Sequence, residues 1–373
     1  MNFRTLLIIM STFYFFGSQT TIAAPNDLFI KTQDYLTKTP SVQLNLDLSI
    51  DAVNDTIDFF DLREKEGITN QSTGDYLGAH ISALYQLYPQ WQIEGTYWYR
   101  EIDYAVDTNK IHTILVGARY FPEFIWNNKY QNLALRASLW QNTASNIDKS
   151  TPTTVNTRTF NQVKVESPDD LQLQLDAIFS KRIDHMNQLN AFAHVGYSKV
   201  NVDQVMIQAQ YNGCLMNIDI HQDNRYVGQL ARPCSLEPGS ELTNLTIRGD
   251  ANEYGLDIQK DLNYRAYYLG LGGSWNWRYR DFESQIAYQY TYLSRKDIDD
   301  RVQNFGSQSI KDNHKIGVKL SYDFHPLATA FVQGEIYQNN FVGDIPFLYN
   351  ALTAPRLDKR YGLASLGIRL KPF

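Results

Sequence analysis

Apolar and polar residues alternate one by one along most of this chain, and this pattern restricts the fold more than any other feature. Every second residue is apolar from Val42 to Ala52, and the same period of two returns from Leu77 to Leu87. An α-helix would spread such residues around its whole circumference, whereas a β-strand places them all on one face. The alternation therefore predicts an all-β protein built from amphipathic strands.

Stretches of this kind recur about thirteen times along the chain. They lie at 42–52, 77–87, 91–104, 110–121, 131–143, 171–179, 188–202, 251–260, 267–279, 284–295, 316–324, 327–340 and 359–372. A single-chain bacterial membrane barrel has an even number of strands, so the pattern predicts an antiparallel up-and-down barrel of about fourteen strands, with about twelve or sixteen as alternatives. A hidden or merged strand is most expected within 156–182 or 203–263.

The connections between these stretches are of two kinds. Tight turns are expected at 88–90 and 325–326, where proline interrupts the pattern. Long polar connections lie at 54–74, 145–168, 203–248, 297–312 and 341–357. Short turns at one rim and long loops at the other are typical of barrels that span a membrane.

The N-terminus has the pattern of a secretory signal peptide. Arg4 is the only charged residue before Asp27, an apolar run follows from Leu6 to Phe16, and Ala23 and Ala24 offer small residues for cleavage. The apolar run is shorter than the ~20 residues that a spanning helix needs, which argues against a membrane anchor. We therefore expect a signal peptide at 1–24, a periplasmic lead-in at 25–40 and a barrel at 41–373.

The polar faces of the strands carry charges of both signs, which decides how the barrel is oriented. Unpaired charges in a dry core would cost several kcal/mol each, whereas a water-filled lumen removes that cost. The apolar faces should therefore point outward to lipid. The candidate lumen charges are Arg119, Arg136, Asp257, Arg278, Arg280, Lys315, Lys319, Asp323 and Arg369.

Four of these cations cluster in the C-terminal third of the chain, and two interpretations stay open. Arg278, Arg280, Lys315 and Lys319 lie on or beside consecutive predicted strands. They could favour the passage of anions, or they could be paired with carboxylates on neighbouring strands.

Both cysteines, Cys214 and Cys234, lie in the long segment 203–248. In an exported protein they are expected to form a disulfide, although two separate thiols are the alternative. The segment is either a plug or cap for the lumen, or a stabilised surface loop.

The alternating strands, the signal-like start and an amphipathic C-terminal stretch from Tyr361 to Phe373 resemble the Gram-negative outer-membrane β-barrel superfamily, in its porin-like form. The resemblance implies residence in the outer membrane and folding by the barrel-assembly machinery, which reads a C-terminal aromatic residue. Here that residue is Phe373. It lies out of phase with Leu366 and Ile368, and Pro372 can end the strand before it.

Motifs of catalysis do not occur in the sequence. A Gly-x-Ser-x-Gly elbow, a His-Glu-x-x-His zinc motif and a phosphate-binding glycine loop are all missing. We therefore expect no enzymatic activity, cofactor or metal site, and the net charge of -6 argues against a nucleic-acid partner.

Two functions remain: a channel for small hydrophilic solutes, or a closed barrel that anchors long loops for adhesion or assembly. The solute and the oligomeric state do not follow from the sequence.

Overall fold

The computed structural model describes most of the chain beyond residue 27. The described residues are 28–32, 44–53, 75–104, 107–123, 128, 130–150, 153–155, 158–237, 240–304, 308–339, 344–351, 353–357 and 360–371. The predicted signal peptide 1–24 and the C-terminal Phe373 lie outside them, and only 28–32 of the predicted lead-in is described.

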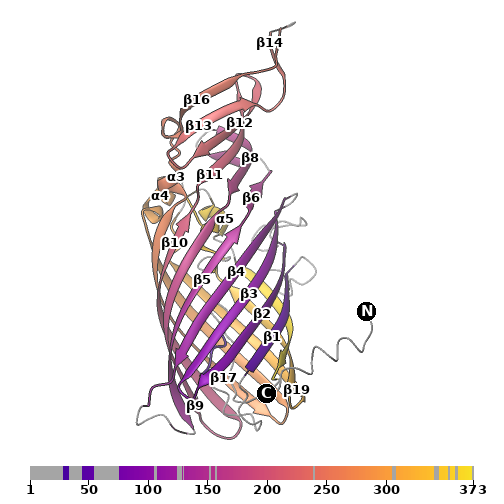
Figure 1. The fold of residues 1–373 in the computed structure, drawn as a ribbon, viewed down its shortest axis with the longest axis vertical. Helices are drawn as coiled ribbons and strands as arrows, with labels where there is room; N and C mark the ends of the chain where they lie inside the picture. The colour runs from indigo at the N-terminus through magenta and orange to yellow at the C-terminus, as the bar shows by residue number, and fades with distance from the viewer. Residues whose placement is uncertain are drawn as a thin grey trace, which may run out of the picture.

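Twelve antiparallel strands form a closed barrel (Figure 1). They are β1 (Leu44–Val53), β2 (Asp75–Tyr88), β3 (Trp91–Tyr104), β4 (Asp107–Tyr120), β5 (Gln131–Ala144), β9 (Asp169–Arg182), β10 (Asn187–Asn201), β17 (Tyr264–Tyr279), β18 (Phe282–Lys296), β19 (Asp312–His325), β20 (Ala328–Tyr337) and β21 (Tyr361–Leu370). Each strand pairs with the next one in this order, and β21 closes the barrel on β1 from Leu46↔Leu370 to Ala52↔Ala364.

Twelve strands is the lower of the predicted alternatives, and the central value of about fourteen is not confirmed. Twelve of the alternating stretches coincide with the barrel strands, but 251–260 holds the 3-10 helix η2 (Ala251–Tyr254) and the helix α3 (Ile258–Asp261). The Asp250 carboxylate accepts a hydrogen bond from the Asn252 N–H, and Asp257 accepts one from the Lys260 N–H. These two caps favour helical turns at a place where the alternation alone suggested a strand.

The two rims of the barrel differ, as the sequence predicted. The short-turn rim carries the connections at 89–90, 121–130, 183–186, 280–281 and 326–327. The long-loop rim carries those between β1 and β2, β5 and β9, β10 and β17, β18 and β19, and β20 and β21. Short helices lie there, namely α3, α4 (Ile298–Asn304), η3 (Pro346–Leu348) and α5 (Ala354–Leu357).

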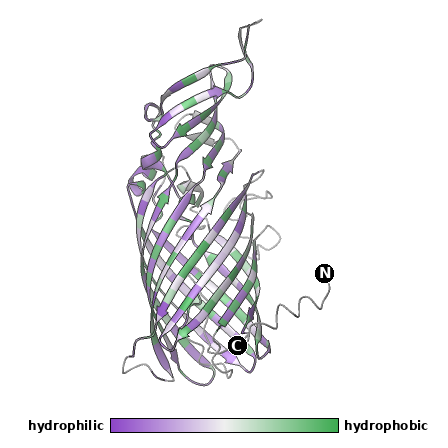
Figure 2. Ribbon diagram, in the orientation of Figure 1, coloured by the Kyte–Doolittle hydropathy of each residue, from purple (hydrophilic) through white to green (hydrophobic). Residues whose placement is uncertain are grey.

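The polarity of the barrel wall is inverted relative to a water-soluble protein. On β1, Leu48 and Ile50 are 44% and 58% exposed on the outside, while Asp47, Ser49 and Asp51 are buried inside. Figure 2 shows the same alternation of hydrophobic and hydrophilic residues along the other strands. The predicted orientation, with apolar faces outward, is therefore confirmed.

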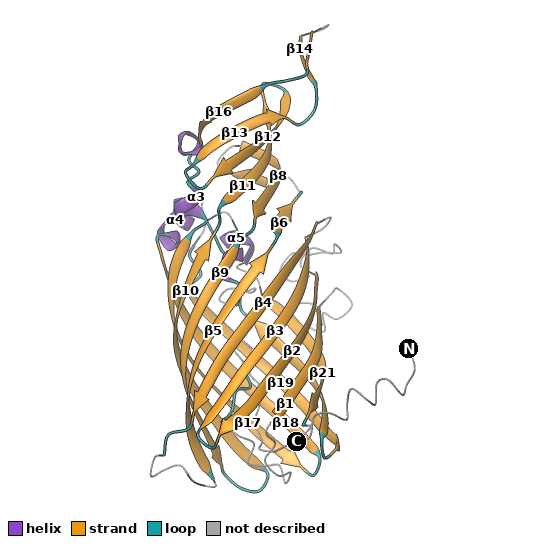
Figure 3. Ribbon diagram, viewed as in Figure 1, coloured by secondary structure: helices purple, strands orange, loops and turns teal. Residues whose placement is uncertain are grey.

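A second sheet stands on the long-loop rim (Figure 3). It contains β6 (Asn146–Lys149), β7 (Thr153–Val155), β8 (Arg158–Glu166), β11 (Gln204–Tyr211), β12 (Cys214–His221), β13 (Arg225–Leu230) and β16 (Thr246–Asp250). Val205, Ile207 and Ile220 form its buried apolar core with residues of η2 and α3. We call this sheet the extension. Segment 203–248 therefore belongs to a structured extension and does not plug the lumen.

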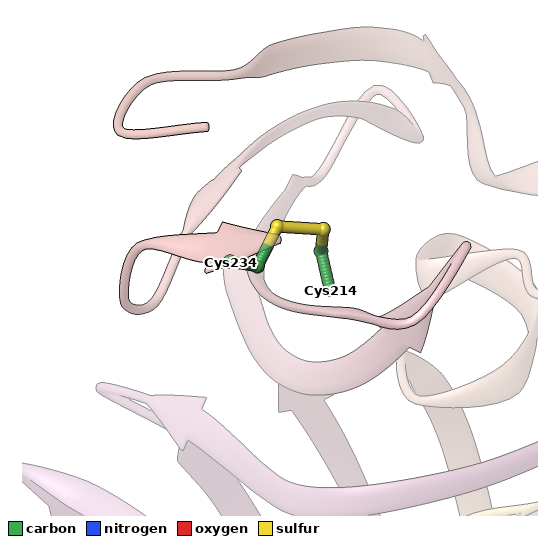
Figure 4. Close-up of a disulfide and its surroundings, with 2 residues drawn as sticks. All are labelled: Cys214 and Cys234. Carbon is green, nitrogen blue, oxygen red and sulfur yellow. A yellow bond between two sulfur atoms is a disulfide. The ribbon is translucent and has the colours of Figure 1, made fainter. Parts of the chain in front are cut away.

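A disulfide joins Cys214 to Cys234, as expected (Figure 4). It connects the start of β12 to the start of β14 (Cys234–Glu237), which pairs with β15 (Ser240–Leu242), and the two Cα atoms are 5.5 Å apart. The cross-link ties the small β14–β15 hairpin to the main sheet of the extension. Among the described residues, helices with the length and apolarity needed to cross a membrane are not found.

Replacing both cysteines, as Cys214→Ser with Cys234→Ser, should loosen the extension and spare the barrel. A cross-link that spans 20 residues stabilises by about 3 kcal/mol through the entropy of the unfolded chain. We expect faster proteolysis of the β14–β15 hairpin and unchanged heat-modifiable gel migration. Loss of the heat-modifiable band would show that the disulfide is needed by the barrel itself.

Candidate functional site

The interior of the barrel is the candidate site, because the polar side chains of all twelve strands converge there. The inward residues include charged, amide and hydroxyl side chains, most of them buried. Two further segments that are not barrel strands also lie inside, and they decide what the interior can do.

The first internal segment comprises residues 28–32, which we call the strap. The Lys31 ammonium lies 3.0 Å from the Glu283 carboxylate on β18, and Arg119 on β4 donates a hydrogen bond to the Lys31 carbonyl. The Thr32 N–H donates to Ser180 Oγ on β9 over 2.9 Å. The strap therefore crosses the interior between β18 on one side and β4 and β9 on the other.

Apolar contacts hold the same segment. Leu28 and Phe29 pack against Ala287, and Ile30 packs with Ile178 and neighbouring wall residues. A Cβ atom on Gly317 would come within 2.7 Å of the Leu28 side chain, so the glycine allows this close approach. The described part of the predicted periplasmic lead-in thus lies inside the barrel, because its Leu-Phe-Ile sequence finds apolar partners there.

A buried charge network lies beside the strap. Glu94 accepts from Arg119 at 3.0 Å and from Arg136 at 2.5 Å, and Arg136 reaches Asp176 at 3.4 Å. The strand register places Arg119 opposite Arg136 and Arg136 opposite Asp176. Side-chain exposure of Glu94, Arg119 and Arg136 is 0%, so the carboxylates must offset the repulsion between two desolvated guanidinium groups.

The remaining predicted lumen charges on the wall are also engaged. Arg278 forms ion pairs with Glu283 and Asp323 near the short-turn rim, and Arg369 binds Asp47 across the β1–β21 seam. The Lys319 ammonium lies 4.1 Å from the centre of the Phe331 ring.

Two predicted lumen residues are not in the lumen wall. Arg280 lies exposed in the turn between β17 and β18, because the tight hairpin moves it off the strand. Asp257 caps α3 and binds Lys260 at 2.7 Å. Burial opposes ionisation there, but hydrogen bonds from Lys260 and Asn224 outweigh it and hold the pKa of Asp257 below its ordinary value.

The second internal segment lies in the connection between β20 and β21 and comprises residues 344–351 and 353–357. We call these residues the upper plug. Asp344 binds Lys315 on β19 at 2.7 Å and accepts from Asn142 on β5 through its carbonyl, while Tyr264 on β17 donates to the Pro346 carbonyl at 2.6 Å. Polar contacts therefore tie the upper plug to three separate strands.

The upper plug also takes part in the largest apolar cluster among the described residues. Ile345, Phe347 and Leu348 are buried together with wall residues such as Leu115 and Trp140. The ring of Tyr349 lies under the Arg295 guanidinium at 3.9 Å. The plug thus fills the interior near the long-loop rim, as the strap does nearer the short-turn rim.

Sequence reasoning missed both internal segments, although each carries a signal. Leu28-Phe29-Ile30 and Ile345-Pro346-Phe347-Leu348-Tyr349 are short apolar runs inside segments that otherwise look like polar connections. Such runs need cover, but the sequence does not say whether another loop or the lumen provides it.

A serine, a histidine and an aspartate meet on the inner wall of β1 and β2. Asp51 Oδ2 is 3.2 Å from His80 Nδ1, and Ser49 Oγ is 2.8 Å from both ring nitrogens. The hydroxyl of a serine nucleophile would lie in line with Nε2 of the histidine. The Ser49 hydroxyl is equally distant from both ring nitrogens and therefore does not have this geometry. Trp98 also donates to Asp51, so we interpret the group as a wall network. Clusters of metal-binding side chains are not found among the described residues.

Comparison with known proteins finds likeness in structure alone. No protein-family model and no curated protein matches the sequence. Among solved structures, the translocator domain of the autotransporter NalP from Neisseria meningitidis is similar with a TM-score of 0.45 and 8% identity over 90% of each chain. The NanC porin gives 0.38 and 10% over 88% and 99%, and the Pseudomonas putida toluene transporter TodX gives 0.36 and 9% over 96% of each chain.

Replacing Glu94 by Gln should destabilise the barrel strongly. The change leaves Arg119 and Arg136 opposite each other without their shared carboxylate, and breaking such a buried pair costs about 3–5 kcal/mol. The measurement is the free energy of unfolding in urea, with the heat-modifiable gel band as the readout of the folded barrel.

Glu101→Gln is the matched control. Glu101 forms an ion pair with the exposed Lys110 at 3.3 Å and accepts a hydrogen bond from the Tyr99 hydroxyl, both on the outer wall, so the change should alter stability by at most about 1 kcal/mol. Equal effects of the two substitutions would contradict the assigned role of Glu94.

Proposed function

We propose that this protein is a β-barrel of the Gram-negative outer membrane that passes small hydrophilic solutes through a lumen closed at rest by the strap and the upper plug. The inverted polarity of the wall carries the proposal. A barrel with an apolar exterior and a charged interior is stable where acyl chains surround it.

The outer surface supports the membrane setting by its dimensions. On β17 the outward row runs from Tyr267 through Leu269, Leu271 and Trp275 to Tyr279, all strongly exposed. The twelve steps from Tyr267 to Tyr279, at about 3.3 Å each and about 40° of tilt, rise about 30 Å, close to the thickness of a hydrocarbon layer. Aromatic residues at both ends match the two interfaces of a bilayer.

The interior supports transport because non-strand segments occupy it. A lumen filled by wall side chains alone could open only if the barrel deformed. Here the strap is attached by an ion pair, hydrogen bonds and a few apolar contacts, so it can leave without breaking the β-ladder. Water can then hydrate the charges that the closed state pairs. Arg119, Arg136 and Lys319 would line the opened passage.

The same proposal implies partners outside the barrel. Export would use residues 1–24, the barrel-assembly machinery would read the C-terminal strand, and membrane lipid would surround the apolar wall. We propose no catalytic role.

The extension favours a second candidate function. A connection that only joined two barrel strands would not need a seven-stranded sheet with its own apolar core and a disulfide. In this alternative the barrel is a closed anchor and the extension binds another macromolecule at the cell surface. Conductance distinguishes the two candidates, because an anchor needs no passage.

Lys31→Gln should raise the open probability of single channels in planar bilayers. The substitution removes the ion pair with Glu283 that holds the strap in the closed state. A tenfold change in open probability corresponds to about 1.4 kcal/mol, which is less than the loss of a buried ion pair can cost. We therefore expect an increase of about tenfold or more over the wild type. Lys181→Gln, the same change at an exposed outward position, should leave conductance unaltered. Silence of both the wild type and Lys31→Gln would favour the anchor.

Leu271→Arg tests the membrane setting separately. Leu271 lies near the middle of the outward row on β17 and is 56% exposed. In a bilayer an arginine there should cost about 2–4 kcal/mol of unfolding free energy, whereas Leu327→Arg in a turn of the short-turn rim should cost about 0–1 kcal/mol. Urea titration in lipid vesicles measures both. A barrel surrounded by water would tolerate both substitutions equally.

A further inference from the structure

Three cations form an unbroken row on the outer wall near the long-loop rim. The strand register places Lys199 on β10 opposite Arg265 on β17, and Arg265 opposite Lys296 on β18. All three side chains are exposed and point outward. We call them the basic row.

The basic row lacks carboxylate partners among the described residues. Ion pairs of Lys199, Arg265 or Lys296 with another described residue are not found. Two nearby acids are engaged elsewhere: Asp169 accepts from Asn201 at 3.4 Å, and Asp299 pairs with the buried Arg295 at 3.6 Å. Asp297, next to Lys296, lies exposed in the turn after β18.

Such an arrangement is unfavourable by itself. Like charges directly opposite each other on neighbouring strands repel, and here two consecutive cross-strand pairs do so. A bound anion would turn the repulsion into attraction. A phosphate suits the row, because arginine binds it through a two-pronged fork and lysines add point charges.

The position of the row identifies the source of the phosphate. The next outward positions toward the barrel's middle are Tyr197 and Tyr267, whose rings lie 5.4 Å apart. Below them the wall is apolar, with Val195 and Leu269 about half exposed. Tyrosines mark the interface of a bilayer, so the basic row lies at the level of the lipid headgroups.

We propose that the basic row of Lys199, Arg265 and Lys296 is a binding site for a phosphorylated lipid headgroup in the leaflet next to the long-loop rim. The proposal rests on the membrane setting proposed above. A lipid bound there would lie against β10, β17 and β18. It would also lie next to the place where β10 leads into the extension and where α3 precedes β17.

Native mass spectrometry of the full-length protein in detergent tests the site. The probe is lipid A with both phosphates, compared with the same lipid after enzymatic removal of the phosphates. We expect the wild type to bind the phosphorylated lipid about 10- to 100-fold more tightly, given three cations near the headgroups. The triple variant Lys199→Gln, Arg265→Gln, Lys296→Gln should lose this preference. The matched control, Lys181→Gln with Arg280→Gln at the short-turn rim, should keep it.

The outcomes separate this proposal from the membrane setting. Equal wild-type binding of the two lipids, or an undiminished preference in the triple variant, overturns the site even if the protein inserts into vesicles. Should the triple variant fail to fold, the charge-preserving variant Lys199→Arg, Lys296→Arg must retain the phosphate preference, and its loss would also overturn the proposal. Failure of the wild type to insert into vesicles would instead contradict the membrane setting.

Discussion

The rest of this structure depends on one interaction: the pairing of opposite charges inside a barrel whose outer surface is apolar. Alternation along a strand gives each residue one of two destinations, the exterior or the interior. Once Leu48 and Ile50 point outward, the alternate residues Asp47, Ser49 and Asp51 must point inward. The interior then has to satisfy them, and it does so through pairs such as Asp47 with Arg369 and Glu94 with Arg119 and Arg136.

The pairing of interior charges explains why the strap and the upper plug lie where they do. Both segments bring a charge to a wall residue of opposite sign, Lys31 to Glu283 and Asp344 to Lys315. Both also bring apolar side chains, which replace water in the remaining volume. Removing either segment would expose charges that water can solvate, and this offsets part of the free energy lost when its apolar side chains leave their partners. That balance is what a gated passage requires, and it is the physical link between the fold and the proposed transport.

The outer wall and the extension serve a different purpose. Apolar and aromatic residues give the wall an apolar belt, which the proposed membrane setting would surround with lipid, and the basic row ends that belt on the side of the long-loop rim. The extension continues from β5 and β10 beyond the rim and forms its own small core with η2 and α3. The molecule thus has an apolar outer wall around the lumen and a separate extension beyond the long-loop rim, each with its own chemistry.

The local pattern of the sequence predicted the twelve barrel strands, their inward and outward faces, the asymmetry of the rims and the partner of Cys214. These features depend on neighbours in the chain or on a single possible pairing. The strand number follows from closure of the ladder, in which β21 pairs with the distant β1. The caps at Asp250 and Asp257 are local, but the alternation at 251–260 does not reveal them. Tertiary contacts also place 28–32, 344–351 and 353–357 inside the lumen, while the described part of 203–248 rises above it. Their partners, Glu283, Ser180, Lys315 and Tyr264, are distant in the sequence, and only closure of the barrel brings them together.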